Sequence, residues 1–181
     1  MKIYVMRHGT TCWNERGITQ GRTNNRLSKN GIELTKKVSE ELKDEKINII
    51  FCSPLMRTIQ TANIINKKIG VKIIKDQRLI EVEQGIFTGR HKDDLTEEER
   101  KLKYAHAKEC GMESYQEIFE RTKNFVDDLK KNCHFENVLI ITHNCNASIM
   151  QLILENREID FQKSQNFKAF KNAEVKSFDI T

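Results

Sequence analysis

Residues 3–11 read Ile-Tyr-Val-Met-Arg-His-Gly-Thr-Thr, an apolar run that ends in charge and glycine. This pattern predicts a buried strand that delivers Arg7 and His8 at its carboxyl end. In an open α/β sheet, ligands bind in the crevice outside the carboxyl ends of the strands. Arginine offers a fixed fork of donors and histidine can attack or transfer a proton, so this strand end suits an anion such as phosphate.

Two later segments repeat the pattern. Residues 47–52 form a second apolar run, which is broken by Ser53-Pro54 and soon followed by Arg57. Residues 137–142 form a third run, followed directly by His143. We therefore expect three strands to bring cationic or imidazole side chains to one edge of a sheet.

The remaining sequence alternates helical and extended patterns. Residues 9–27 are expected to form a polar loop, and further strands are expected at 71–75 and near 173–180, with a helix near 146–155. Capping patterns start helices after Ser28, Thr96 and Ser114, and Gly70 ends the helix that follows Pro54. The alternation predicts a three-layer α/β/α sandwich with a mostly parallel central sheet, as a single domain over residues 1–181.

Further motifs accompany the strand ends. In chain order they are Arg7-His8-Gly9-Thr10-Thr11 with Trp13-Asn14, Gln20-Gly21-Arg22, Ser53 to Ala62, Leu79-Ile80-Glu81 with Gly85 and Gly89, and His143. Together, and in this order, they resemble the histidine phosphatase superfamily, which also contains the cofactor-dependent phosphoglycerate mutases. The resemblance spans most of the chain and implies phosphoryl transfer through a phosphohistidine intermediate on His8.

The residue types agree with that chemistry. Phosphoryl transfer needs an in-line nucleophile, cations around the equatorial oxygens and an acid for the leaving group. A neutral imidazole near pH 7 can attack phosphorus, which suits His8. We expect Arg7 and Arg57 to bind the phosphoryl oxygens in bidentate fashion and His143 to donate a hydrogen bond to them. Residues expected to contact substrate are Asn14, Gln20, Gly21, Arg22 and Asn144, although Arg22 is as well suited to holding its loop.

The proton donor should be a carboxyl group with a raised pKa beside the anionic substrate. Glu81 is the preferred candidate because its spacing to Gly85 and Gly89 matches the acid loop of the resembled family. Glu83 is the alternative. Two departures from the family pattern bear on specificity: Thr10 stands where many relatives carry an acidic residue, and Asn144 replaces a glycine that commonly follows the second histidine.

Three activities remain open. The resembled mutases are longer and close over the substrate with an insertion that carries paired arginines, whereas residues 90–112 are short and hold no Arg-Arg pair. Because a mutase must exclude water while the substrate reorients, we favour a phosphatase acting on a small phosphorylated metabolite. A phosphoglycerate mutase and a non-catalytic phospho-ligand binding module are the alternatives.

Composition limits the other classes. Formal net charge is +5 in 181 residues, and the lysines are interspersed with glutamates, so no nucleic-acid partner is expected. No apolar run is long enough for a membrane helix and no signal-peptide pattern is present. The five cysteines are an odd number without a Cys-x-x-Cys pair, which favours a reducing cytoplasm.

No metal and no cofactor are expected. Two-metal phosphatase chemistry needs clustered Asp, Glu and His ligands, whereas these strand ends supply arginine and histidine. The remaining histidines, His91, His106 and His134, are expected at the surface. The sequence does not indicate the oligomeric state.

Overall fold

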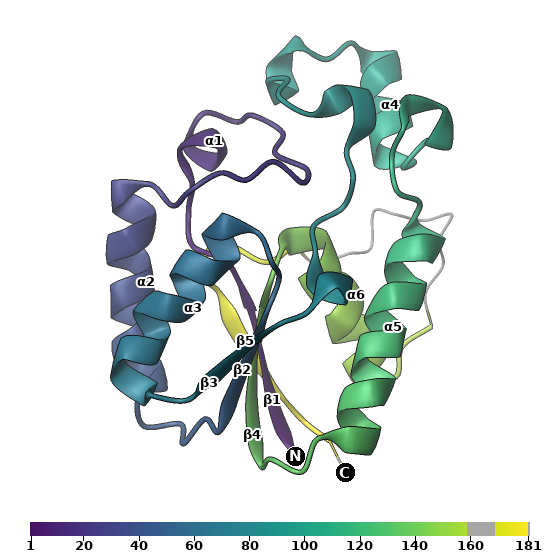
Figure 1. The fold of residues 1–181 in the computed structure, drawn as a ribbon. Coiled ribbons are helices and arrows are strands. Elements are labelled where there is room, and N and C mark those ends of the chain that lie inside the picture. Colours follow the sequence, from purple (N-terminus) through teal and green to yellow (C-terminus); the bar gives the residue numbers. More distant parts are fainter. Residues whose placement is uncertain (159–168, 181) are drawn as a thin grey trace.

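The computed structural model describes residues 1–158 and 169–180. Its core is one sheet of five strands in the order β3-β2-β4-β1-β5 (Figure 1). The strands are β1 (Lys2–Arg7), β2 (Ile49–Cys52), β3 (Lys72–Lys75), β4 (Asn137–Thr142) and β5 (Val175–Asp179). The first four are mutually parallel, and β5 pairs antiparallel with β1 at one edge. The predicted mostly parallel sheet is therefore confirmed.

Helices cover both faces of this sheet. They are α1 (Cys12–Glu15), α2 (Lys29–Leu42), α3 (Met56–Ile69), α4 (Glu97–Tyr104), α5 (Tyr115–Asn132) and α6 (Asn144–Leu154). Figure 1 shows α2 and α3 on one face and α5 and α6 on the other. This arrangement is the predicted three-layer sandwich.

The first strand shows why a continuous apolar run folds as a buried strand. Ile3 and Val5 join the cluster under α5 and α6, whereas Tyr4 and Met6 join the cluster under α2 and α3. Successive side chains of a strand point to opposite faces, so a strand covered on both faces needs apolar residues at every position. All four residues are buried.

Helix ends follow the predicted capping signals. The Ser28 hydroxyl accepts a hydrogen bond from the Gly31 N–H, and Thr96 and Ser114 each form a complete capping box. At the end of α3, Gly70 adopts a left-handed conformation with φ of 75°, which an L side chain rarely takes.

Two regions differ from a simple alternation. The stretch expected as a polar loop contains the one-turn helix α1, closed by a capping box between Thr11 and Asn14. A single turn is too short to show hydrophobic periodicity.

Residues 85–112 form a small layer beyond the carboxyl edge of the sheet, built from 3-10 turns and α4 (Figure 1). Phe87, Leu95, Cys110 and Met112 make a separate small core there. Part of the irregular stretch expected after α6 lies at 159–168, outside the described residues.

Candidate active site

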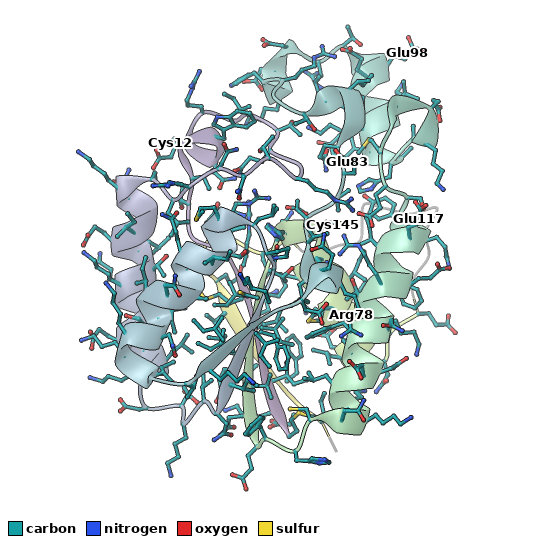
Figure 2. The ribbon with its side chains drawn as sticks, in the orientation of Figure 1. Cys12, Arg78, Glu83, Glu98, Glu117 and Cys145 are labelled. Carbon is teal, nitrogen blue, oxygen red and sulfur yellow. The ribbon has the colours of Figure 1, made fainter. Side chains whose placement is uncertain are left out.

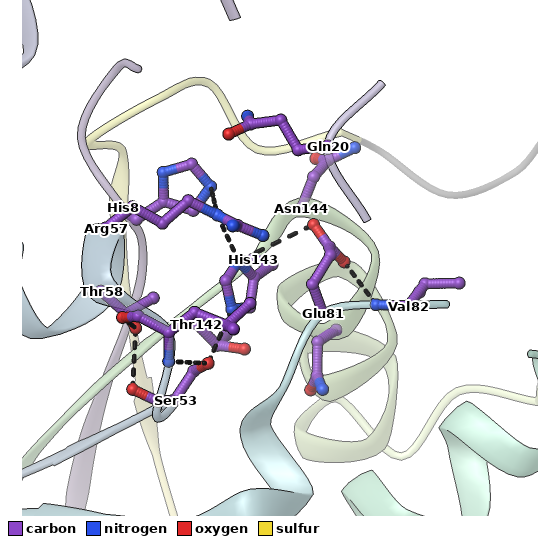
Figure 3. A network of polar contacts seen from close by, with 12 residues as sticks. His8, Gln20, Ser53, Arg57, Thr58, Glu81, Val82, Thr142, His143 and Asn144 are labelled. Atoms are coloured by element: carbon purple, nitrogen blue, oxygen red, sulfur yellow. Dashed lines mark hydrogen bonds and ion pairs between the residues drawn. The ribbon is translucent and has the colours of Figure 1, made fainter. Parts of the chain in front are cut away.

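Two histidines meet at the carboxyl edge of the sheet. The register of β1 with its parallel neighbour β4 pairs Arg7 with Thr142. The residues that follow, His8 and His143, therefore lie side by side, with ring centroids 5.1 Å apart (Figure 3). Both side chains are buried. The predicted meeting of these two strand ends is observed.

His8 is held in one tautomer. Its Nδ1 lies 2.7 Å from the carbonyl oxygen of Gly9. Because a carbonyl oxygen only accepts, Nδ1 carries the ring proton and Nε2 keeps its lone pair. Burial, together with the positive charges of Arg57 and Arg7, holds the pKa of His8 well below 6.5. The ring is therefore neutral at pH 7, with its unprotonated nitrogen available for attack.

The glycine after His8 allows the chain to turn tightly against α2. A Cβ atom at Gly9 would lie 2.4 Å from the Thr35 hydroxyl and 3.0 Å from the Gly31 carbonyl oxygen. In addition, the Gly9 N–H donates to the Thr61 hydroxyl on α3 at 3.1 Å. The packing against α2 therefore leaves no room for a side chain at residue 9, and the hydrogen bond to Thr61 ties the backbone next to His8 to α3.

Arg57 enters the site from the first turn of α3 and is fully buried. Its Nε–H is shared between the two histidines, 3.2 Å from His8 Nε2 and 3.2 Å from His143 Nδ1. Its Nη atoms donate to the carbonyl oxygens of Thr23 and Gly21 at 2.8 and 2.9 Å. Burial lowers the pKa of Arg57 to about 10, so the group remains charged at pH 7. The Arg57 guanidinium was expected to bind phosphoryl oxygens, but two of its nitrogens instead hold the loop of residues 21–23 near the histidines.

His143 is neutral for the same reason as His8. Burial, followed by the charge of Arg57, holds its pKa well below 6.5. Because Nδ1 accepts from Arg57, Nε2 carries the proton and donates to the Ser53 hydroxyl at 2.8 Å. Nδ1 also lies 3.8 Å from a carboxyl oxygen of Glu81.

Glu81 supplies a carboxyl group to the same cluster. One of its oxygens accepts from the Val82 N–H at 3.0 Å and the other faces His143 (Figure 3). Burial raises the pKa of Glu81 above 4.5, although Arg57 and Arg7 oppose the shift. Glu83, the alternative acid, accepts from the Gln84 N–H and lines a different cavity with Lys108 and Glu117. The structure therefore places Glu81 beside the histidines.

Arg7 lies largely buried at the end of β1. Its Nη1 donates to the Phe170 carbonyl oxygen at 2.6 Å. Its Nε is buried and has no hydrogen-bond partner among the described residues. Burial lowers the pKa of Arg7. A buried guanidinium donor without a partner is suited to an anion at this position.

The five residues expected to bind substrate surround this cluster, and each makes contacts within the protein. Asn14 and Gln20 are joined through Thr11, and the Gly21 carbonyl oxygen accepts from Arg57. Arg22 donates to the Glu81 carbonyl oxygen and to the Glu113 carboxylate. Asn144 accepts from the Phe170 N–H, and so holds the segment whose carbonyl oxygen binds Arg7. Direct contacts of these residues with substrate stay predictions.

Several contacts of the site were not expected from the sequence. The Ser53 hydroxyl lies 2.8 Å from His143 Nε2 and accepts its proton, and Asn172 donates to the His8 carbonyl oxygen and to the Asn14 side chain. The prediction that His106 is a surface residue was wrong: it is 8% exposed and stacks on Tyr115 with ring centroids 3.9 Å apart. These residues lie in loops and turns, where periodicity gives no signal for burial.

Residues 1–158 and 169–180 contain no group of three or more His, Cys, Asp or Glu side chains arranged to hold a metal ion. Within the same ranges, every helix is too short or too polar to span a bilayer.

The chain is similar in sequence to proteins of known family. Over residues 3–181 the chain matches the histidine phosphatase superfamily (branch 1). It is 30% identical over 149 residues to phosphoserine phosphatase 1 of Hydrogenobacter thermophilus, covering 79% of this chain and 71% of that protein. It is 34% identical over 149 residues to an Enterobacter sp. protein named "Probable phosphoglycerate mutase GpmB", covering 79% and 69%.

Solved structures share the fold. The α-ribazole phosphatase of Shigella flexneri superposes with a TM-score of 0.86 at 24% identity, covering all of this chain and 91% of that one. A mycobacterial glucosyl-3-phosphoglycerate phosphatase superposes with a TM-score of 0.87 at 20% identity, covering 97% and 91%. With its paired histidines at the ends of β1 and β4 and its match along nearly the whole sequence, this chain belongs to branch 1 of the histidine phosphatase superfamily.

Proposed function

We propose that the protein is a metal-independent phosphomonoester hydrolase that acts on a small phosphorylated metabolite through a phosphohistidine intermediate. The proposal rests on two groups of one site, a neutral histidine that can attack phosphorus and a carboxyl group with a raised pKa that can donate a proton. The buried His8 ring is neutral with Nε2 unprotonated, and the nearby Glu81 carboxyl has a raised pKa and so retains its proton more readily. A nucleophile and an acid are thus both poised for reaction.

In the first step, the lone pair of His8 Nε2 forms a bond to phosphorus while the bond from phosphorus to the leaving oxygen breaks. The proton of the Glu81 carboxyl passes to that oxygen, which leaves as an alcohol. The hydrogen bond from Nδ1 to the Gly9 carbonyl oxygen stabilises the positive charge that develops on the ring.

In the second step, water attacks the phosphorus of the phosphohistidine and the bond to Nε2 breaks. The Glu81 carboxylate takes one proton from the water, which regenerates its acid form and releases inorganic phosphate. Each residue therefore returns to its starting state after one turnover.

The cations around His8 would stabilise the charge of the transferring group. Arg7 would use its unpartnered Nε, and Arg57 would redirect the Nε–H that it shares between the histidines. His143, whose ring centroid is 5.1 Å from that of His8, would bind the same oxygens once its Nε2–H leaves the Ser53 hydroxyl. Asn14, Gln20, Gly21, Arg22 and Asn144 would bound the substrate, either directly or by fixing the loops that do so.

The small layer of residues 85–112 beyond the carboxyl edge of the sheet, called the cap below, favours hydrolysis over isomerisation. Arg90 is engaged by Glu99, with nitrogen to oxygen distances of 2.5 and 3.2 Å, and Lys103 donates to the Thr19 hydroxyl. These cations hold the cap together, whereas a mutase needs cations that hold the carboxylate of a retained substrate. Relatives named as phosphatase and as mutase both match this chain, so the experiment must separate the two activities.

The cytoplasm is the proposed location. All five cysteines are free thiols in the structure, which suits a reducing compartment.

Two assays test the function. With p-nitrophenyl phosphate and excess chelator, we expect turnover, and its complete loss on chelation would contradict metal independence. With 3-phosphoglycerate and catalytic 2,3-bisphosphoglycerate, release of inorganic phosphate should equal or exceed formation of 2-phosphoglycerate. Rapid isomerisation with negligible phosphate release would identify a mutase, and binding of inorganic phosphate without any turnover would identify a binding module.

A further inference from the structure

The loop that carries Glu81 is fastened through a series of backbone carbonyl groups. The carbonyl oxygen of Arg78 accepts from Arg121 at 2.6 Å, and that of Glu81 accepts from Arg22 at 3.0 Å. The carbonyl oxygen of Glu83 accepts from the Glu113 N–H at 3.0 Å. Between these points, Thr142 and Asn146 donate to the carbonyl oxygens of Leu79 and Ile80.

Three of these five carbonyl groups are held through Glu113, and one of the three, that of Arg78, also accepts from Asn146 at 3.3 Å. The Glu113 carboxylate accepts from Arg121 Nε at 2.7 Å and Nη2 at 3.0 Å, a bidentate pair, and from Arg22 Nη2 at 3.1 Å. Its own N–H makes the third tether. Glu113 comes from the turn before α5, Arg121 from within α5, and Arg22 from the loop after α1, so its carboxylate joins three segments around the acid loop.

The ion pair between Glu113 and Arg121 is shielded from water, whereas the Arg22 side chain is 36% exposed. The Glu113 side chain is 11% exposed and that of Arg121 is 15% exposed. Partly buried, bidentate pairs of this kind hold their geometry far better than exposed pairs, which contribute little. Removing one partner would leave the other charge poorly compensated.

We propose that Glu113 is a positioning residue for Glu81, in addition to the proposed function on which this inference rests. Its carboxylate holds Arg22 and Arg121 where they fasten the acid loop, and it offsets their positive charge. It acts through these arginines without contact with the reacting atoms.

The charge balance around Glu81 explains why this offset matters. Charged and titratable groups surround the carboxyl groups of Glu81 and Glu113. They are Arg7, His8, Arg22, Arg57, Glu83, His106, Lys108, Glu117, Arg121, His143 and Cys145. Arg121 is one of the cations that oppose the raised pKa of Glu81. Without the negative charge at residue 113, the positive charges of Arg121 and Arg22 would be uncompensated. They would then favour the ionised form of Glu81, which cannot donate a proton.

Glu113→Gln tests the proposal, because it keeps the shape of the side chain and removes its charge. The substrates are an alkyl phosphate, whose poor leaving group needs the acid, and p-nitrophenyl phosphate, which needs it less. At pH 7 we expect kcat for the alkyl phosphate to fall about tenfold or more, within the range that general acids contribute. For p-nitrophenyl phosphate we expect a change of less than about threefold, and the basic limb of the alkyl profile should move to lower pH.

Matched variants separate charge from packing. Arg121→Gln removes a cation and should move the basic limb in the opposite direction, to higher pH. Glu113→Asp retains the charge and should leave the limb near its wild-type position. The control is Glu117→Gln, at the start of α5 (Figure 2). It removes an exposed carboxylate that pairs with Lys108 in the same cavity, and kcat for both substrates should stay at the wild-type value.

The outcomes are distinct. Equal losses on both substrates with an unmoved basic limb would overturn the role of Glu113 while leaving the proposed function intact. Wild-type protein that hydrolysed neither substrate would overturn both. If Glu113→Gln does not fold, Arg121→Gln and Glu113→Asp decide the question. Basic limbs of the alkyl phosphate profile that lay at the same pH in these two variants would contradict the charge offset.

Discussion

Arg57 and His8 are joined by a hydrogen bond from Nε to Nε2 at 3.2 Å, and Nε2 is the unprotonated ring nitrogen that we propose attacks phosphorus. The cation therefore lies beside the proposed point of bond formation before any substrate enters. Transfer of this N–H to a phosphoryl oxygen would release the lone pair and neutralise charge on the transferring group. In the proposed mechanism, one arginine would thus orient the nucleophile and stabilise the transition state.

Arg57→Met tests this relationship. We expect kcat/KM for p-nitrophenyl phosphate to fall by about 100-fold or more, because a preorganised donor is lost. The carbonyl oxygens of Gly21 and Thr23 also lose their donor, and we expect the free energy of unfolding to fall by about 1–3 kcal/mol in urea denaturation. Arg26→Met, at an exposed arginine, is the control. Retention of more than a tenth of the activity would show that Arg57 serves the fold alone.

The identity of the nucleophile is tested at His8. His8→Ala should lower kcat by at least about three orders of magnitude, as found for other covalent nucleophiles. Rapid acid-free quenching with labelled substrate should trap a base-stable, acid-labile phosphoryl group on the wild type only. His134→Ala, at an exposed histidine, should retain both activity and label. Activity within tenfold of wild type in His8→Ala would rule out the assignment.

The identity of the acid is tested by the leaving group. Glu81→Gln should slow alkyl phosphates far more than p-nitrophenyl phosphate, whereas Glu83→Gln should affect neither strongly. The pH profile of kcat/KM should be bell-shaped: activity rises as His8 loses its proton, below 6.5, and falls as Glu81 loses its proton, above 4.5. A larger effect from Glu83→Gln, or equal slowing of both substrates by Glu81→Gln, would show that the acid is misassigned.

Stability should also depend on pH through the buried histidines. Since folding holds the pKa values of His8 and His143 well below 6.5, the unfolded chain binds more protons as the pH falls below that value. Their contribution to stability is therefore present above 6.5 and is lost toward the folded-state pKa values, by up to about 1.4 kcal/mol per pH unit for each ring.

Glu81 opposes this trend, because its raised pKa favours the folded state at low pH and that contribution is lost as the pH rises through the folded-state value. Urea denaturation between pH 7 and pH 5 should therefore show a shallower loss of stability in His8→Gln than in wild type. An identical slope in the two proteins would mean that His8 titrates alike in the folded and unfolded chain.

The strands and the residues at their ends could be predicted because their signals are local. His8, Arg57 and His143 each follow an apolar run, and the parallel sheet brings such ends to one edge. The acid loop was placed by resemblance, and the structure brings Glu81 to within 3.8 Å of His143.

The supporting contacts could not be predicted in the same way. Glu113 follows a turn in a polar stretch. Its proposed positioning role depends on Arg22 and Arg121, which come from other segments of the chain. Ser53 marked the end of a strand in the sequence, yet its hydroxyl also accepts the hydrogen bond from His143 Nε2. Such roles depend on which loops meet in space, and hydrophobic periodicity carries no information about that.

The pairing of β1 with β4 has a consequence for how the chain becomes active. These neighbouring strands come from opposite ends of the sequence, and the helices and strands between them must first be connected correctly around the sheet. Contacts of such long range are entropically costly to close and tend to slow folding. A refolding chain should thus regain helical circular dichroism before it regains affinity for inorganic phosphate, which makes anion binding a reporter of the pairing between β1 and β4.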